Sequence, residues 1–200
     1  MKLDQSFYRR DDVLQIGKDL LGKYLFTRLN GDEITGGMIV ETEAYMGAVD
    51  KAAHSYDNRR TERTEIMYQQ GGVAYVYLCY GIHSLFNVIT NDKDIPEAVL
   101  IRAVKPTHGV GTILERRNKV KLQRNVAGGP GMLTKALGID TSHDGLDLTG
   151  NKIWIEDLDF KVKERNIICS PRVGVDYAEE DAANPWRYRI KGSEWTSPAK

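Results

Sequence analysis

Residues 73–90 read VAYVYLCYGIHSLFNVIT, and this stretch determines the expected fold. It contains two runs rich in β-branched and aromatic residues, 73–80 and 85–90, which are typical of strands. Only residues 81–84 separate the two runs, so the stretch predicts a β-hairpin with Tyr80 and Gly81 near its tip. An antiparallel strand pair is therefore expected in the middle of the chain.

Further strands are expected on either side of this hairpin. The runs at 23–29 and 38–45 flank Asn30-Gly31, a dipeptide that strongly favours a tight hairpin turn. The apolar run 98–104 predicts another strand. Shorter strands are expected near the C-terminus, at residues 152–156, 172–176 and 187–190.

Helices are expected at three places. Asp11 or Asp12 can cap a helix whose apolar residues follow the helical period up to Gly22. A basic helix is predicted over residues 109–124 and a short one over 130–137, closed by Gly138. Strands dominate the middle of the chain without a regular strand–helix–strand alternation. We therefore predict a single α+β domain over residues 1–200, in which helices flank a curved, mostly antiparallel sheet.

The composition is that of a globular protein. The chain has 200 residues, of which 41% are hydrophobic and 28% charged. No run approaches the roughly 18 apolar residues of a membrane span. The first residues, MKLDQSFYRRDD, contain no apolar signal core, so a cytoplasmic protein is expected. No long apolar stripe points to an obligate partner, and a monomer is expected.

The two cysteines, Cys79 and Cys169, offer neither a disulfide framework nor a paired zinc-binding spacing. Both are expected to be buried as small hydrophobic residues. Glu41, Glu43, His54 and His83 could be assembled into a metal site on paper, but no HExxH or comparable spacing supports one. No metal is therefore expected.

The net charge is zero, from 28 basic and 28 acidic residues, but the charges are segregated. The segment 102–124 contains seven basic residues and one acid, Glu115. A second basic group consists of Arg59, Arg60 and Arg63. Segregation of this kind can produce a positive face on a neutral protein, as phosphate binding requires. A set of solvated helix faces would give the same pattern.

Two carboxylates on one strand are the first candidates for chemistry. In an alternating strand, Glu41, Glu43 and Tyr45 share one face with Ile39. Carboxylates on an apolar strand must be solvated, paired or used. Adjacent acids can also turn one of the carboxylates into a base near neutral pH. An exposed face with structural salt bridges is the alternative interpretation.

Three further residues interrupt otherwise ordinary strands. Arg102 breaks the apolar run 98–104 and needs a carboxylate or phosphate partner. Asn87 lies in the second hairpin strand and must find a hydrogen-bond partner, either a ligand or backbone. Tyr80 at the hairpin tip would expose an uncovered ring. Beside basic groups, such a ring suits stacking on nucleic acid bases or wedging between them.

Taken together, these residues resemble the alkyladenine DNA glycosylase family, also called 3-methyladenine DNA glycosylases. The resemblance is carried, in chain order, by ETEAY at 41–45, AAHS at 52–55, YVYxxYG at 75–81, Asn87, LIRA at 100–103, RVGV at 172–175 and Gly192-Ser193 before Trp195. The combination is far more specific than any single motif and covers nearly the whole chain. It implies one domain with a protruding hairpin that inserts into DNA.

The resemblance also implies a role for each matching residue. Glu43 matches the general base that activates water for attack on C1′ of the deoxyribose. Arg102 matches an arginine that orients the nucleotide and the water, and Tyr80 the side chain that fills the gap left by the flipped nucleotide. The base-binding pocket is implied to consist of Tyr45, His54, Tyr77 and Asn87.

The family's partner is double-stranded DNA containing damaged purines, and the resemblance implies no cofactor and no metal. One loop departs from the family pattern: residues 56–58 stand where a glycine pair is usual, and Glu62 stands where proline is common. The resemblance therefore does not fix the loop that would bring Arg59, Arg60 and Arg63 to the DNA backbone.

The expected activity is base excision by a monofunctional DNA glycosylase, which hydrolyses the N-glycosidic bond of alkylated or deaminated purines and leaves an abasic site. A lysine nucleophile is not expected, because the lysine nearest to Glu43 is Lys51. Two alternatives stand beside this prediction. One is a catalytically silent nucleic-acid-binding module, since formyltransferase C-terminal domains have a related fold and bind RNA. The other is a metal-dependent hydrolase.

Overall fold

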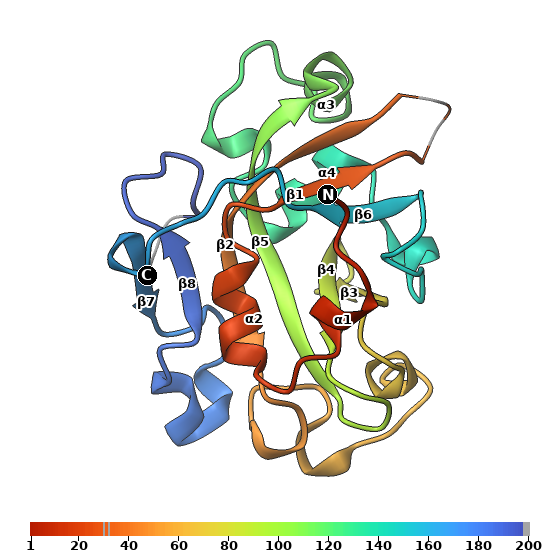
Figure 1. Cartoon of the computed structure of the whole chain (residues 1–200), viewed down its shortest axis with the longest axis vertical. Coiled ribbons are helices and arrows are strands. Elements are labelled where there is room, and N and C mark those ends of the chain that lie inside the picture. Colours follow the sequence, from red (N-terminus) through yellow and green to blue (C-terminus); the bar gives the residue numbers. More distant parts are fainter. Residues whose placement is uncertain (30, 32, 198–200) are drawn as a thin grey trace.

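An eight-stranded sheet forms the centre of the protein in the computed structural model, which describes residues 1–29, 31 and 33–197 (Figure 1). Six strands follow the order β3-β4-β5-β2-β1-β6, and every described pairing is antiparallel. The strands are β1 (Tyr24–Thr27), β2 (Thr35–Tyr45), β3 (Ala74–Cys79), β4 (His83–Thr90), β5 (Glu97–His108), β6 (Ile153–Glu156), β7 (Ile167–Ser170) and β8 (Arg187–Ile190).

Strand β2 is the element on which the sheet is organised, because three strands pair with it. Strand β5 runs along one edge of β2 for most of its length. On the other edge, β1 pairs with the first part of β2 and β8 with residues 41–43. The residues at the end of β2 therefore lie between two neighbouring strands and are screened from water.

Short helices cover the sheet and its ends. Asp4 caps α1, and Asp12 caps α2 by accepting a hydrogen bond from the Gln15 amide. Gly138, with φ of 73°, ends α4. The α-helices are α1 (Gln5–Tyr8), α2 (Val13–Asp19), α3 (Val110–Arg116) and α4 (Pro130–Leu137). The 3-10 helices are η1 (Gly47–Val49), η2 (Tyr56–Asn58), η3 (Glu65–Tyr68), η4 (Arg124–Val126), η5 (Thr141–His143), η6 (Glu164–Asn166) and η7 (Asp176–Ala183).

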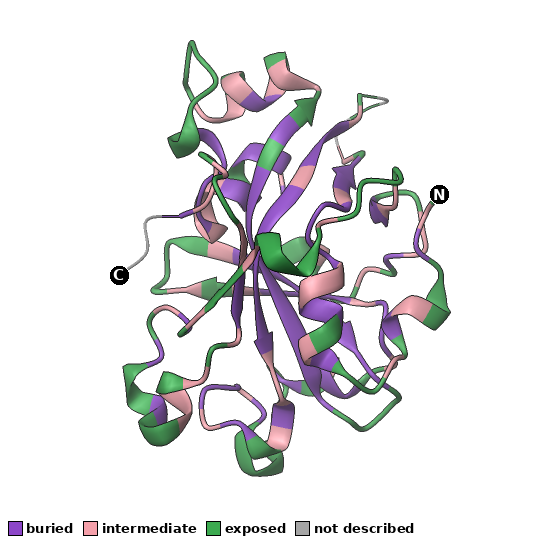
Figure 2. Ribbon diagram, turned by 60° about the vertical axis from the view of Figure 1, so that its left-hand side comes forward, coloured by how far each residue is buried: buried purple, intermediate pink, exposed green. Residues whose placement is uncertain are grey.

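The main core lies between the sheet and these helices, and Figure 2 shows buried residues running along the central strands. Helix α2 lies across β2 and β5 (Figure 1). It contributes Val13, Ile16 and the backbone of Gly17, whose carbonyl accepts a 2.7 Å hydrogen bond from the buried Thr42 hydroxyl. This contact fixes one face of the end of β2 against a helix and leaves the other face to line a cavity.

The predicted fold class, an α+β domain around a mostly antiparallel sheet, is confirmed. Strands β1 and β2 pair as expected, although Asn30 of the predicted turn lies outside the described residues. Strands β3 and β4 form the second expected hairpin, with β4 beginning at His83 instead of residue 85. The helix at 130–137 is confirmed with its Gly138 cap, and the helix capped by Asp12 is confirmed over residues 13–19, although it ends before the expected Gly22. Within the described part of the chain, no helix is long and apolar enough to cross a membrane.

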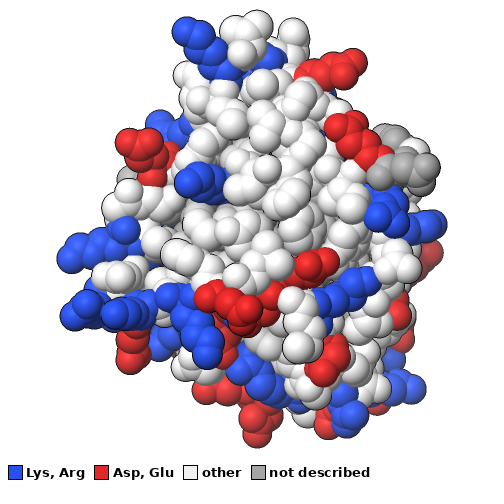
Figure 3. All heavy atoms as spheres, turned by 45° about the horizontal axis from the view of Figure 1, so that its top comes forward, with Lys and Arg blue, Asp and Glu red and all other residues white. Residues whose placement is uncertain are grey.

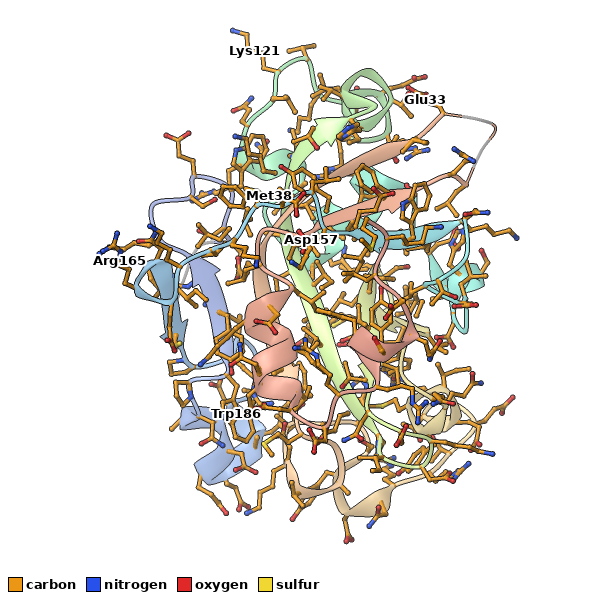
Figure 4. All side chains as sticks on the ribbon, in the orientation of Figure 1. Glu33, Met38, Lys121, Asp157, Arg165 and Trp186 are labelled. Atoms are coloured by element: carbon orange, nitrogen blue, oxygen red, sulfur yellow. The ribbon has the colours of Figure 1, made fainter. Side chains whose placement is uncertain are left out.

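The helix predicted over residues 109–124 is wrong beyond Arg116, where α3 ends. The backbone turns away at Asn118, whose φ is 50°, and the Arg117 side chain donates to the carbonyls of Asn125 and Val126. Val120 is 92% exposed, so the segment has no apolar face to pack and helix formation gains no tertiary support. Figure 4 shows Lys121 projecting from this loop at the end of the molecule.

Two other expectations near the C-terminus and at the cysteines are wrong. The strand predicted at 172–176 is a loop, and the strand of this region is β7, which was not predicted. Cys169 is exposed on β7, which pairs on one edge with β8, and Cys79 is half-buried beside the hairpin tip. Strands β3 and β7 each pair with a neighbour on one edge only, so Cys79 and Cys169 are not enclosed in the core.

The alternation of β2 is interrupted near Glu41. The register between β2 and β5 shifts on both sides of Glu41, as at a β-bulge. Ile39 consequently packs in the main core with Ala44. The expectation that Ile39 shares a face with Glu43 is therefore wrong, although Glu41 and Glu43 do point to the same side, where both contact Arg102.

A glycine in this strand gives a direct test of how tightly β2 and β5 approach. A Cβ added at Gly37 would lie 2.4 Å from the Lys105 carbonyl oxygen, which is backbone and cannot move aside. We expect Gly37→Ala to lower the free energy of unfolding in urea by about 1–3 kcal/mol. The matched control is Gly111→Ala in α3, where nothing lies within 4 Å of the added Cβ. Its stability should be unchanged or raised by up to about 1 kcal/mol; equal stability of both variants would contradict the register.

Candidate active site

A cavity of about 500 Å³ opens on the face of the sheet away from α2. It has the size of a small-molecule pocket and is lined largely by aromatic and apolar side chains. The structure brings to its wall eight of the residues singled out in the sequence: Glu43, Tyr45, His54, Arg63, Tyr77, Tyr80, Asn87 and Arg102. These residues come from four strands and two loops that are far apart in the sequence.

Glu43 is fully buried near the end of β2, and its carboxylate lies in the cavity wall. Oε2 accepts hydrogen bonds from the Arg102 guanidinium at 3.1 Å and from the Tyr45 hydroxyl at 3.0 Å. Oε1 accepts one from the backbone amide of Val173 at 2.8 Å. Since each carboxylate oxygen can accept about two hydrogen bonds, Oε1 retains capacity for a further donor such as water.

Glu41 has the same burial but a different environment. Arg102 and Arg187 donate to its Oε1 at 2.9 and 2.8 Å, and Ser197 donates to the same carboxylate from both its amide and its hydroxyl. Burial raises the pKa of Glu41, but Arg102, Ser197 and Arg187 outweigh burial and hold the pKa below its usual value. Glu41 is outside the cavity lining and serves as a structural counter-ion.

Arg102 joins the two glutamates. Its guanidinium is almost completely buried, with Nε on Glu41 and Nη1 on Glu43. Burial alone would lower the pKa of Arg102, but Glu43 and Glu41 raise it. The predicted need of this strand arginine for a carboxylate partner is thus confirmed, and two carboxylates meet it.

Aromatic rings form the opposite walls of the cavity. The His54 and Tyr77 rings are 4.6 Å apart in an edge-to-face arrangement, and Nδ1 of His54 lies 2.9 Å from the Tyr75 hydroxyl. Burial, together with Arg63 and Arg59, lowers the pKa of His54 to about 4. The imidazole is therefore neutral at physiological pH, and the pocket wall beside it carries no charge from this residue.

Tyr45 and Asn87 complete the wall. Burial and the neighbouring Glu43 raise the pKa of Tyr45 well above its usual value, so its hydroxyl stays protonated and donates to Glu43. The Asn87 amide donates to the Tyr75 carbonyl at 3.1 Å, which fixes the orientation of the side chain at the cavity. Asn87 therefore bonds to the backbone and also lines the cavity, so it meets the expectation of a backbone partner and can still face a ligand.

Tyr80 occupies the tip of the β3–β4 hairpin, at the mouth of the cavity. It is 88% exposed and has a φ of 50°, a conformation that is uncommon for a bulky residue. Leu78 and Ile82 on either side are also exposed. The tip therefore presents apolar groups to solvent next to a concave pocket, as the sequence predicted for Tyr80.

The three arginines of the polar loop have different environments. Arg63 lies over the Tyr77 ring at 5.1 Å and lines the cavity. Arg59 lines an adjoining hollow that shares His54 and Arg63 with it. Arg60 is instead ion-paired with Glu65 and Asp94 and lies outside both linings. In the view of Figure 3, a broad uncharged area occupies the upper half and basic side chains gather mainly at its margins.

A metal site made of Glu41, Glu43, His54 and His83 was considered in the sequence analysis. The structure does not bring these four residues together as one. Both glutamates are held by Arg102, and His54 by Tyr75. Among residues 1–29, 31 and 33–197, no three His, Cys, Asp or Glu side chains form a group that could hold a metal ion.

Sequence reasoning missed several residues that build the site. Tyr75, Arg172 and Val173 were quoted only as parts of motifs. Arg172 is buried behind the cavity, and the Val173 amide contacts Glu43. Arg172 in an apolar context was an available signal, because a buried arginine demands partners. Nothing in the sequence indicated a role for the Val173 amide, because its contact with Glu43 depends on the path of the loop.

Comparisons with known proteins show which family the chain resembles. The model of the methylpurine-DNA glycosylase family matches residues 6–194. A protein of Natranaerobius thermophilus is 45% identical, with 98% of this chain and 99% of that protein covered. Relatives from Chlamydia felis and Clostridium novyi are 44% and 43% identical, over 94% and 98% of this chain and 95% and 98% of their own. Each of the three is named provisionally as a 3-methyladenine DNA glycosylase.

The match of the family model and the identities of these relatives extend over nearly the whole chain, so the resemblance noted in the sequence is confirmed. The protein belongs to the methylpurine-DNA glycosylase family.

Proposed function

We propose that this protein is a monofunctional DNA glycosylase, which takes an alkylated or deaminated purine out of duplex DNA into the cavity and hydrolyses its N-glycosidic bond. The observation that carries the proposal is the fully buried carboxylate of Glu43 in the wall of an aromatic cavity of about 500 Å³. A catalytically silent binding module would have no use for a buried carboxylate that faces such a cavity.

In the proposed reaction Glu43 acts as a general base on water. The C1′–N bond of the nucleotide breaks and its electron pair leaves with the purine, while the water oxygen forms a bond to C1′ and its proton passes to Glu43. The transition state carries positive charge on the sugar, as in other glycoside hydrolyses. A carboxylate below the sugar stabilises this charge as well as accepting the proton. Arg102 keeps the carboxylate oriented through its 3.1 Å contact.

The chemistry of the walls suits a damaged purine. Tyr45, Tyr77 and neutral His54 offer ring faces and edges to a planar base. A cationic alkylated ring gains about 0.5–2 kcal/mol of cation–π attraction from such rings. A protonated His54 would repel the same cation, so its lowered pKa supports this assignment. Asn87 lines the cavity, and its proposed role is to crowd the exocyclic amino group of guanine.

Tyr80 is proposed to fill the space that the purine leaves in the duplex. Extracting a base costs a few kcal/mol, and damaged, weakly paired bases cost less, which favours them as substrates. An exposed ring at the mouth of the cavity can offset the lost stacking. Arg59 and Arg63, which lie beside the cavity, are the arginines best placed to contact phosphates, whereas Arg60 is engaged with two acids.

No lysine lines the cavity among the residues described. A Schiff-base intermediate with C1′ would require an amine such as that of lysine in the cavity, so the proposed product is an abasic site in an uncut strand. The proposed partner is double-stranded DNA that contains damaged purines, on which the protein acts as a monomer.

The first test is Glu43→Gln. The amide has nearly the same shape but cannot accept the proton from water, so the single-turnover rate of purine release should fall by about 10²- to 10⁴-fold. Affinity for a duplex with one defined lesion should change only a few-fold. Glu97→Gln is the matched control, because Glu97 is also a buried glutamate of the sheet but bonds to Asn91 outside the cavity. Near-normal release by Glu43→Gln would overturn the mechanism.

The second test is Tyr80→Ser, which leaves the carboxylate in place and removes the ring from the hairpin tip. Base stacking of about 1–3 kcal/mol would be lost, equivalent to a roughly 5- to 150-fold weaker Kd for lesion-containing duplex. Val120→Ser changes an equally exposed apolar residue at another end of the protein and should leave Kd unchanged. Fluorescence of a 2-aminopurine placed beside the lesion reports extrusion directly, and normal extrusion by Tyr80→Ser would exclude this role.

The third test uses the lowered pKa of His54. The unfolded histidine takes up a proton near pH 6.5 and the folded one only near pH 4. The unfolded state therefore binds more protons between these values, and stability falls as the pH drops. From pH 7 to pH 5, His54 should account for about 2 kcal/mol of lost unfolding free energy. Urea titrations of the native protein and His54→Gln at both pH values measure this; equal pH dependence would show that His54 is not held neutral.

A further inference from the structure

A second buried ion pair lies directly behind the cavity. Arg172 donates from Nη1 and Nη2 to the two oxygens of Asp50 at 2.5 and 2.8 Å, and both side chains are completely buried. Neither residue lines the cavity. Burial would lower the pKa of Arg172, but its bonds to Asp50 outweigh burial and raise it. The Arg172 guanidinium is thus held in a fixed, bidentate contact with Asp50 in the protein interior.

This ion pair joins three segments that form the cavity wall. Arg172 also donates to the carbonyl of Ala44, the residue of β2 between Glu43 and Tyr45, at 3.0 Å. Asp50 accepts from the amides of Met46 and Ala52, and so holds the loop that leads to His54. The ion pair therefore connects the end of β2 to the 46–54 loop and to the 171–175 loop.

The guanidinium of Arg172 is also enclosed by aromatic rings. It lies 4.7 Å from the centre of the Tyr45 ring and 4.9 Å from that of Trp186. Trp186 stands immediately before β8 and is labelled in Figure 4. Tyr45 is a cavity wall that donates to Glu43, so the position of this ring depends on the same arginine.

We propose that the Arg172–Asp50 pair is a positioning element for the chemical step: it sets the Val173 amide and the Tyr45 hydroxyl against the Glu43 carboxylate. The amide follows Arg172 directly in the chain and donates to Oε1 at 2.8 Å. Two of the three donors to Glu43 are thus held by Arg172, and the third is Arg102. The proposal rests on the proposed role of Glu43 as general base.

A lysine cannot replace this arginine. Its ammonium group can approach Asp50, but it lacks the planar fork that reaches both carboxylate oxygens and the Ala44 carbonyl together. In Arg172→Lys the charge is retained while the 171–175 loop loses its fixed distance from β2. Small displacements of a reacting group of this kind reduce rates by up to about 100-fold.

The experiment is single-turnover purine release from a duplex with one defined lesion, at saturating enzyme and from pH 5 to pH 9, with Arg172→Lys in the full chain. We expect the rate to fall by about 10- to 100-fold. Kd for a duplex carrying a tetrahydrofuran abasic-site analogue, which places no base in the cavity, should change less than threefold. Losing an amide donor favours the protonated carboxylic acid, so the acid limb of the pH–rate profile should move to higher pH.

The matched control is Arg10→Lys. Arg10 also donates to a carboxylate, Asp19 at 2.6 Å, and to a carbonyl, that of Phe7, and stacks over the Phe7 ring, but it lies outside the cavity. Its variant should keep the native rate and the native pH profile. Circular dichroism and urea titration establish that each variant is folded at the assay temperature.

Val173→Pro removes the amide donor without changing the Arg172 side chain, and it provides the test if Arg172→Lys does not fold. It should lower the rate and move the acid limb in the same direction. A folded Arg172→Lys or Val173→Pro protein with the native rate and pH profile would overturn the positioning proposal. Glu43→Gln, measured in parallel, separates the two hypotheses: if it retains activity, the proposed function fails, and if it is inactive while the loop variants are normal, only the positioning proposal fails.

Discussion

The buried contact of Arg102 with Glu41 and Glu43 is the interaction on which the site depends. Two carboxylates and one guanidinium are almost completely buried together. An uncompensated charge there would be strongly destabilising, by about 3–5 kcal/mol when one partner of such a pair is removed. Arg187 and Ser197 supply the remaining partners of Glu41, which allows Glu43 to face the cavity with Arg102 still in contact.

Strand β2 can carry this charged group because its two faces are used differently. One face packs on α2 through Thr42, and the other faces the cavity with Glu43 and Tyr45. Strands β5 and β8 pair with opposite edges of the same residues, so the backbone near Glu43 has little freedom to move. Stiff strands hold Glu43, the proposed general base, while the loops at 46–54 and 171–175 complete the walls around it.

The sequence predicted most of the elements, because their signals are local. Caps at Asp12 and Gly138 and the hairpin of residues 73–90 depend on signals that act over a few residues, and these predictions were confirmed. The helix at 109–124 failed because its second half lacks an apolar face, and the strand at 172–176 failed because Arg172 turns inward to Asp50. The β-bulge near Glu41 changed the partner of Ile39, which no alternation rule anticipates.

By itself, the sequence determined the fold class, the family and the identity of the residues at the cavity, since motif residues and short-range patterns are written in consecutive positions. Only the tertiary structure decided that His54 is neutral, that Arg172 pairs with Asp50, and that the Val173 amide donates to Glu43. The neutral state of His54 arises from burial and nearby arginines, whereas the contacts of Arg172 and the Val173 amide join segments more than a hundred residues apart, so local sequence patterns do not encode them.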